Sequence, residues 1–255
     1  MDVIFGNVAK TTNFIYHLEK LFRTYFRRIL LAKAMLVNFR GRQMAEIVEY
    51  SQSDREAVRE ICFRTGFLGK SLAGIIDYKD LFVDLATHYF LDARKSCIFV
   101  AKDSGRVIGY GVIIDDVKEY KISSTKYYIY RVFLDVVRFR LFRKKEFLYY
   151  TRLLLYYLKG DFTLPEFYEY PALLHINISD GYQGLGIGSR LFESMFAGLK
   201  SKSCSGVQLQ THSANEKSVG FFKKHGFAEL ASKETKFYQT YGAGVVKTIA
   251  MGKKF

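Results

Sequence analysis

The chain has 255 residues, of which 49% are hydrophobic and 25% charged, so it can bury a sizeable core in one large domain or two small ones. Its three cysteines follow no metal-binding spacing, and their odd number disfavours a disulfide framework. No apolar run approaches the roughly 18–20 residues of a membrane-spanning helix, and the start of the chain does not resemble a signal peptide. Composition therefore excludes collagen, an integral membrane protein, a disulfide mini-protein and a zinc module, and we expect a cytoplasmic protein.

The net charge of +14 is concentrated in two segments. Residues 1–43 carry eight basic and two acidic side chains, and residues 117–160 carry eleven and three, so the rest of the chain is neutral overall. A neutral body with two basic additions points to nucleic acid less strongly than a uniformly basic chain does. Charge therefore disfavours nucleic acid as the partner, although basic and aromatic residues interleave in the second segment.

Residues 12–38 predict one amphipathic helix, because their apolar residues recur at helical spacing and their basic residues lie mostly toward another face. Two interpretations stay open. The helix packs on the body of the protein or on a second subunit of a homodimer, or it lies on an anionic membrane surface. We therefore expect residues 1–43 to form a basic N-terminal helical extension.

The body of the chain predicts alternating strands and helices. The predicted elements before the basic segment are a strand (44–50), two helices (53–65 and 77–91) and two strands (97–102 and 106–114) joined by a hairpin turn at Asp103-Ser104-Gly105. Residues 118–160 lack Gly and Pro before Gly160, which predicts one long helix or two shorter ones. The remaining predicted elements are a strand (172–178), a helix (188–202), a strand (206–211), a helix (215–225) that ends at Gly226, and strands near 227–239 and 245–252.

The segment from Ile178 to Arg190 joins a strand to an amphipathic helix and is rich in glycine. The first amides of a helix lack intrahelical acceptors, and the helix dipole adds a partial positive charge there. Glycines allow a phosphate to approach the backbone, so the segment predicts an anion cradle suited to a diphosphate. A tight strand-to-helix turn is the alternative. The absence of a Lys-Ser/Thr ending disfavours an NTPase loop, and the position late in the chain disfavours a dinucleotide fold.

Two motifs resemble those of the GNAT superfamily of acetyl-CoA-dependent N-acetyltransferases. Gln183-Gly-Leu-Gly186-Ile-Gly188 is similar to its Q/R-x-x-G-x-G/A signature, and the run from Asn215 to Phe227 resembles N-x-x-A-x-x-x-Y-x-K-x-G-F. The resemblance covers roughly residues 44–116 and 170–252. It implies an α/β (α+β) fold with a mixed, mostly antiparallel twisted sheet and helices on both faces. The GNAT domain would span 44–255, with a helical insertion at about 117–170.

The same resemblance implies acetyl-CoA as co-substrate. Its pantetheine would lie where strands 172–178 and 206–211 splay apart, bonded to the backbone of Ile176, Asn177 and Ile178. Its diphosphate would bind the backbone amides of Gln183, Gly184, Leu185, Gly186, Ile187, Gly188 and Ser189. On the second motif, Asn215 would contact the pantetheine arm, and Ser218 and Phe222 would line the acyl-CoA side.

Two departures from the family's pattern affect catalysis. The tyrosine of the second motif, which would protonate the leaving thiolate, is Phe222 here. Strand 172–178 contains no carboxylate, so His175, its only titratable side chain, is the candidate general base; a packed structural histidine is the alternative. The other candidates are His212, Asp115 and Asp116. No metal-ligand spacing occurs, and no metal is expected.

We therefore expect an N-acetyltransferase in which the primary amine of a small molecule or peptide attacks acetyl-CoA directly in a ternary complex. The alternative is a catalytically weak or inactive acyl-CoA-binding module whose basic helical region associates with a membrane or a nucleic acid. The basic insertion would form a helical wall over the acceptor side, where its cluster of arginines and lysines suits an anionic acceptor or a charged surface. A solvated helix face is the other interpretation of that cluster.

Overall fold

The computed structural model describes residues 45–92, 96–140, 144–200 and 204–255. Residues 45–255 form one compact unit. The helix predicted at 12–38, and with it the extension 1–43, lies outside the described residues and stays a prediction. No helix in the described part of the chain is both long enough and apolar enough to cross a bilayer.

The elements largely follow their predicted order and bounds. They are β1 (Glu46–Glu49), η1 (Gln52–Asp54), α2 (Arg55–Thr65), α3 (Lys79–Asp92), β2 (Ser96–Asp103), β3 (Arg106–Ile114), α4 (Val117–Val137), α5 (Lys144–Leu158), β4 (Ala172–Ile178), α6 (Ile187–Lys200), β5 (Gly206–His212), α7 (Glu216–Lys224), β6 (Ala228–Thr235), η3 (Phe237–Tyr241) and β7 (Val246–Lys254). Residues 118–160 form two helices rather than one. The strand predicted near 227–239 is wrong in its last part, because it stops at Thr235 and the short helix η3 follows.

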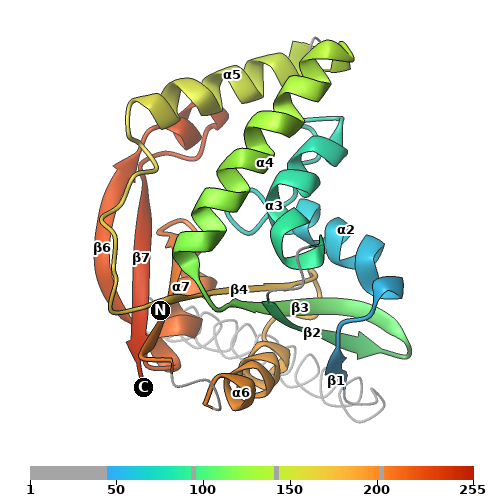
Figure 1. Ribbon diagram of the computed structural model, residues 1–255, viewed down its shortest axis with the longest axis vertical. Coiled ribbons are helices and arrows are strands. Elements are labelled where there is room, and N and C mark those ends of the chain that lie inside the picture. The colour runs from blue at the N-terminus through green and yellow to red at the C-terminus, as the bar shows by residue number, and fades with distance from the viewer. Residues whose placement is uncertain (1–44, 93–95, 141–143, 201–203) are drawn as a thin grey trace, which may run out of the picture. The chain divides into compact units, whose positions relative to one another are not determined.

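A seven-stranded sheet in the order β1-β2-β3-β4-β5-β7-β6 forms the centre of the unit. Every neighbouring pair is antiparallel except β4 and β5, which are parallel. Helices α2 to α4 lie on one side of the sheet and α6 on the other (Figure 1). The predicted fold, a mixed and mostly antiparallel sheet with helices on both faces, is confirmed.

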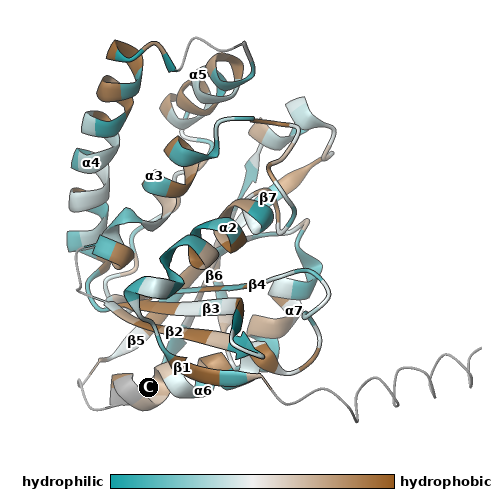
Figure 2. Ribbon diagram, turned by 90° about the vertical axis from the view of Figure 1, so that its right-hand side faces the viewer, coloured by the Kyte–Doolittle hydropathy of each residue, from teal (hydrophilic) through white to brown (hydrophobic). Residues whose placement is uncertain are grey.

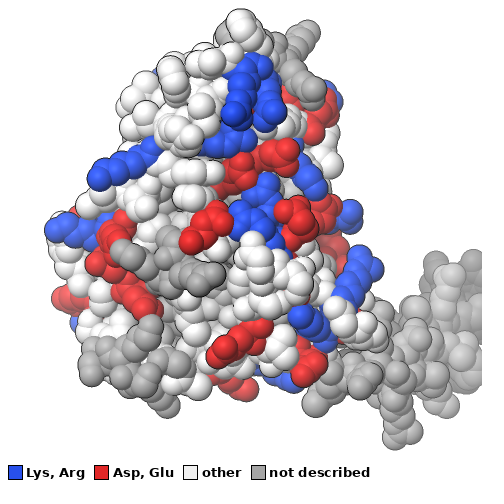
Figure 3. Space-filling view, turned by 45° about the vertical axis from the view of Figure 1, so that its right-hand side comes forward, with Lys and Arg blue, Asp and Glu red and all other residues white. Residues whose placement is uncertain are grey.

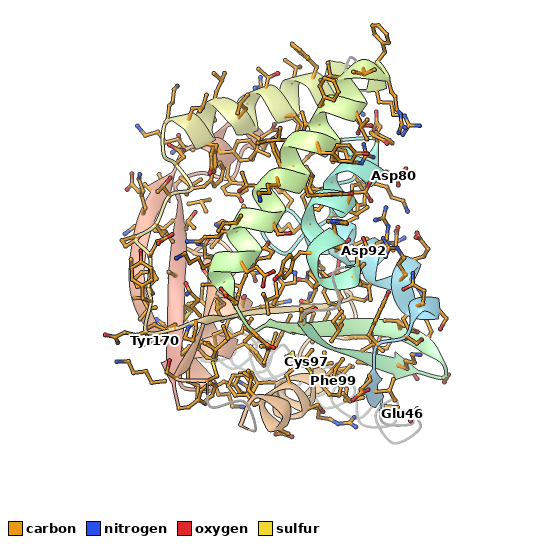
Figure 4. The ribbon with its side chains drawn as sticks, viewed as in Figure 1. Glu46, Asp80, Asp92, Cys97, Phe99 and Tyr170 are labelled. Carbon is orange, nitrogen blue, oxygen red and sulfur yellow. The ribbon has the colours of Figure 1, made fainter. Side chains whose placement is uncertain are left out.

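The core between α6 and the sheet is formed by apolar residues that lie on one face of α6. Leu191, Met195 and Leu199 recur every four residues on α6, and all three are buried. Gly111 of β3 makes this packing possible, because a Cβ at that position would lie 2.6 Å from the Met195 side chain. Phe99 of β2 lies on the same side of the sheet, toward α6 (Figure 4).

The opposite face of the sheet carries two further apolar clusters. One joins β3 to α2 and α3. The other is rich in aromatic rings and joins α5, η3 and the loop between α2 and α3; Tyr149 and Phe237 meet there edge to face, with ring centroids 5.6 Å apart.

Charged residues alternate in sign on the surface over α2 and α3 (Figure 3), where Arg55 pairs with Asp92 and Arg59 with Asp84.

Candidate active site

Strands β4 and β5 separate soon after they begin. They pair only at Ala172 with Val207 and at Leu173 with Gln208. Beyond these residues β4 pairs with β3 alone, and β5 pairs with β7 alone, among the strands of the described residues. The divergence that the family resemblance implied is therefore present, and one edge of β4 is left open along residues 174–178.

The backbone of β4 offers hydrogen-bonding groups to this gap at alternate residues. Ser179 N donates to Ile108 O across a distance of 2.8 Å, so its backbone faces β3. Because antiparallel pairing alternates along a strand, the backbone of Asn177 also faces β3, whereas those of Ile176 and Ile178 face the gap. The geometry thus supports the predicted backbone contacts of Ile176 and Ile178, and it turns the Asn177 backbone away from the gap.

The glycine-rich turn at the end of β4 forms an open cradle. Gly184 and Gly186 have φ values of 77° and 78°, which other residues rarely adopt. No atom lies within 4 Å of the position that a Cβ would occupy on either of them, so the backbone is accessible to a ligand. Helix α6 starts at Ile187, and its first turn contains no acidic residue. The first backbone bond closed by the helix runs from Arg190 N to Gly186 O at 3.2 Å, which leaves the preceding amides for an anion.

Two side chains frame the cradle. Gln183 Nε2 donates to Ile178 O at 3.3 Å, and Lys217 Nζ of α7 donates to Gln183 Oε1 at 3.4 Å. A positive charge on α7 therefore lies beside the start of the cradle. On the inner side, a Cβ at Gly188 would lie 3.1 Å from Phe221 and 3.3 Å from the Ile178 side chain, so this glycine is needed for close packing rather than for φ.

The three residues predicted on the second motif have clear structural contacts. Asn215 is the N-cap of α7, and its Oδ1 accepts from Ser218 N at 3.2 Å. The Ser218 hydroxyl accepts from Thr211 Oγ1 of β5 at 3.1 Å. Phe222 is 6% exposed and packs in the core shared with α6, with its ring edge to face with Phe227. Their direct contact with a coenzyme stays a prediction.

A connected polar group lies on the other face of β4, toward α2 and α3. Asn177 Nδ2 lies 2.9 Å from His175 Nε2 and 2.8 Å from the Tyr110 hydroxyl, which is itself 3.2 Å from His175 Nε2. Tyr110 of β3 is fully buried, and burial raises its pKa well above the usual value. Burial likewise raises the pKa of the neighbouring Cys62 thiol to about 11, so both groups stay protonated at neutral pH.

His175 is the exposed member of this group. Its side chain is reachable by solvent, yet protein atoms surround it closely enough for desolvation to lower its pKa to about 4. The ring of Phe90 lies beside it, with the two ring centroids 6.4 Å apart. His175 is therefore a neutral imidazole at pH 7, which is the state that can accept a proton.

The other candidate bases have different surroundings. His212 lies on β5 across the gap, bonded to the Tyr238 hydroxyl at 3.1 Å and to Thr248 Oγ1 at 3.4 Å, and burial lowers its pKa to about 4. Asp116 is the N-cap of α4, where its carboxylate accepts from two backbone amides. In the described ranges, no three His, Cys, Asp or Glu side chains are grouped to hold a metal ion.

The sequence alone did not point to Tyr110 or Lys217 as site residues. Tyr110 contacts residues more than sixty positions away, and only the register of β3 against β4 brings them together. Lys217 lies within the second motif, but its contact with Gln183 depends on how α7 sits beside the cradle. Both contacts are set by tertiary structure, which the local sequence pattern does not specify.

Comparison with known proteins agrees with this arrangement. The acetyltransferase (GNAT) family matches residues 155–227, which include β4, the cradle, α6, β5 and α7. The crystal structure of a protein called SsHAT is 24% identical, with a TM-score of 0.58 over 83% of this chain and 98% of that one. A phosphinothricin acetyltransferase from Sinorhizobium meliloti, solved with AcCoA, is 14% identical, with a TM-score of 0.51 over 84% of this chain and 89% of that one. An N-acetyltransferase from Staphylococcus aureus Mu50 is 13% identical, with a TM-score of 0.51 over 83% and 99%.

These matches converge on one fold and on the segment that forms the cradle. The fold likeness extends over more than four fifths of the chain, and the range of the family match contains both motifs. The resemblance seen in the sequence is thus confirmed at the level of the fold: the chain has the fold of GNAT acetyltransferases, and residues 155–227 match the acetyltransferase (GNAT) family.

Proposed function

We propose that the protein transfers the acetyl group of acetyl-CoA to the primary amine of a small molecule or peptide. The observation that carries this proposal is the separation of β4 from β5 beyond Leu173, with an open glycine cradle at the end of β4. A structure of similar fold was solved with AcCoA, which supports the choice of coenzyme.

The coenzyme would bind through the backbone. The amides before Arg190 would hold the diphosphate at the N-terminus of α6, with Lys217 as a nearby counter-charge. The pantetheine arm would lie in the gap and bond to the backbone of Ile176 and Ile178 like an added strand. Fixing both substrates in one site would supply much of the rate by proximity.

In the chemical step, the neutral amine nitrogen attacks the thioester carbonyl carbon, the C–S bond breaks, and CoA leaves as a thiolate. A backbone N–H that faces the gap, such as that of Ile178, would stabilise the negative charge that develops on the carbonyl oxygen. His175 would take the proton that the amine loses. Phe222 can supply no proton, but a thiol with an ordinary pKa of about 8.5 is a good leaving group without one.

Asn177 determines which nitrogen of His175 is free for this task. If its amide oxygen faces the ring, His175 Nε2–H donates to it, and the Nδ1 lone pair is available as a base. If its nitrogen faces the ring, Nε2 accepts and Nδ1 carries the proton, so neither nitrogen is free as a base. The amide oxygen can replace the nitrogen at the same contacts of 2.8 and 2.9 Å, and the base role of His175 requires that orientation.

Release of free thiol from acetyl-CoA tests the proposal. The wild-type chain should release thiol with at least one amine of a broad panel, and His175→Ala should lower kcat by about 10²- to 10⁴-fold, the usual contribution of a general base. His88→Ala is the control, because His88 pairs with Asp92 on α3. Binding of CoA without turnover on any amine would favour the inactive acyl-CoA-binding module instead.

A further inference from the structure

Helices α4 and α5 each bury charged side chains and expose many apolar ones. The buried residues of α4 are Arg131 and Asp135, which pair at 2.5 Å, and Arg131 also pairs with Asp84 of α3 at 2.9 Å. In α5, Glu146 is 1% exposed and accepts from the backbone amides of Asp77 and Tyr78, both at 2.7 Å. The polar side chains of both helices are thus used to attach them to the body.

The outward faces of the same helices are apolar. On α4, Ile129, Phe133, Val136 and Val137 recur at i, i+4, i+7 and i+8, and Phe133 is 63% exposed. Among the described residues, thirteen of the sixteen large hydrophobic side chains that are exposed lie on this helical pair or, for Phe139, just after α4: Ile122, Ile129, Tyr130, Phe133, Val136, Val137, Phe139, Phe147, Leu148, Leu154, Leu155, Tyr157 and Leu158. We call this set the outer apolar face. Figure 2 shows apolar segments on both helices.

A cluster of this many apolar side chains exposed to solvent is typical of an interaction site. An ordinary surface helix has the reverse pattern, with its apolar stripe toward the core. The ion pairs that bury Arg131 and Asp135 fix α4 in this orientation, so rotation of the helix about its axis would break them. The outer apolar face is therefore a property of the folded chain.

The charge around this face determines which partner it suits. Residues 117–160 carry eleven basic side chains, and two of their three acidic side chains, Asp135 and Glu146, are buried. Exposed basic residues are Lys118 and Lys126 on α4, Arg138 and Arg140 just after α4, and Lys159 just after α5. A second copy would bring the same positive charge against this face, and residues 1–43 are also basic, so both are electrostatically unfavourable occupants.

We propose that the outer apolar face docks on an anionic lipid bilayer. Exposed aliphatic side chains would enter the boundary between headgroups and acyl chains, while the neighbouring lysines and arginines contact lipid phosphates and carboxylates. The predominance of Ile, Val and Leu suits acyl chains better than nucleic-acid bases, which bind to aromatic platforms. This docking surface is separate from acetyl transfer and does not depend on it.

The chain contains no tryptophan, which allows a site-specific test. Phe133→Trp places a single fluorophore on the outer apolar face. Phe255→Trp is the matched control, because Phe255 is 51% exposed and lies beside Phe196 of α6, on the other side of the sheet. The full chain is mixed with phosphatidylcholine vesicles that either contain or lack phosphatidylserine. We expect a blue shift of Phe133→Trp emission with the anionic vesicles only, and no shift of Phe255→Trp.

Co-sedimentation with the same vesicles completes the test. The double variant Ile129→Ser/Phe133→Ser should bind anionic vesicles at least about tenfold more weakly, because two exposed apolar side chains no longer insert. Sedimentation without a shift of Phe133→Trp emission would overturn the proposal, since another part of the chain would then bind the lipid. Absence of sedimentation, or a concentration-dependent shift without vesicles that marks docking to a second copy, would overturn it as well.

Discussion

The amide nitrogen of Asn177 lies 2.9 Å from Nε2 of His175, on the face of β4 away from α6. This contact connects the only titratable side chain of the strand to the buried Tyr110 hydroxyl, 2.8 Å from the same amide. The imidazole is therefore held in one orientation beside the open edge of the strand, and its neutral state follows from desolvation.

Asn177→Asp should raise the pKa of His175 from its value of about 4. A carboxylate at hydrogen-bond distance favours the imidazolium, typically by about 1–3 pH units. Because a base must be unprotonated to act, activity is lost below its pKa, and the acid limb of kcat/KM should move to higher pH by a similar amount. NMR titration of the histidine signals, together with the pH–rate profile, measures both effects. His212 serves as the internal control, and an unmoved His175 signal would contradict the assignment.

Burial of His212 makes the fold sensitive to acid. Its pKa is lowered to about 4, whereas in the unfolded chain it is about 6.5. Between these values the unfolded state binds more protons, so the free energy of unfolding decreases as pH falls from about 6.5 toward 4 and is unaffected by this group at higher pH. His212→Gln should show a flatter dependence in urea unfolding over this window. An identical slope in the variant and the wild type would be evidence against the buried neutral state.

Glu146→Ala should destabilise the fold by about 3 kcal/mol or more, since it leaves two backbone amides without their charged acceptor, each worth about 1.5–3 kcal/mol. Glu146→Gln keeps an acceptor oxygen at the same place and should cost less. Urea unfolding measures the difference. Equal stability of the two variants would mean that the bonds to Asp77 and Tyr78 contribute little.

Phe222→Ala should cost about 3–5 kcal/mol in the free energy of unfolding, the usual effect of removing a buried phenyl ring. Phe222 is 6% exposed and contacts the Phe227 ring, so its role in packing is large whatever its role at the site. Phe221→Ala tests the neighbouring, partly buried ring and should cost less. A loss below about 1 kcal/mol for Phe222→Ala would contradict the packing seen here.

The sequence predicted most of the fold because strong local patterns specify it. The bounds of β3 and β4 are as predicted, and Gly226, with φ of 83°, follows the end of α7. The hairpin turn at Ser104-Gly105 is also confirmed, with both residues at positive φ. These features depend on neighbouring residues, which is the range over which periodicity and turn chemistry carry information.

Long-range relationships could not be predicted in the same way. The contacts of Tyr110 with His175 and Asn177 depend on strand register, and the contacts of Lys217 depend on helix placement. The apolar stripe of α4 does not mark its buried face either, although such a stripe ordinarily lies toward the core. Here Arg131 and Asp135 face inward, since Asp84 and Tyr78 offer them partners on α3 and the preceding loop.

The central claim is that the cradle at residues 183–189 binds the diphosphate of the coenzyme, and calorimetric titration with CoA tests it most directly. Gly186→Ala adds a Cβ to the open cradle at φ 78°, whereas Gly242→Ala adds one at the same φ, also in open space, after η3. The two variants carry the same backbone strain and differ only in whether the added Cβ lies in the cradle. We predict that wild type and Gly242→Ala bind CoA alike and that Gly186→Ala binds at least about tenfold more weakly, a loss of about 1.4 kcal/mol or more. Absence of binding heat with the wild type, or equal affinity of the two variants, would contradict the claim.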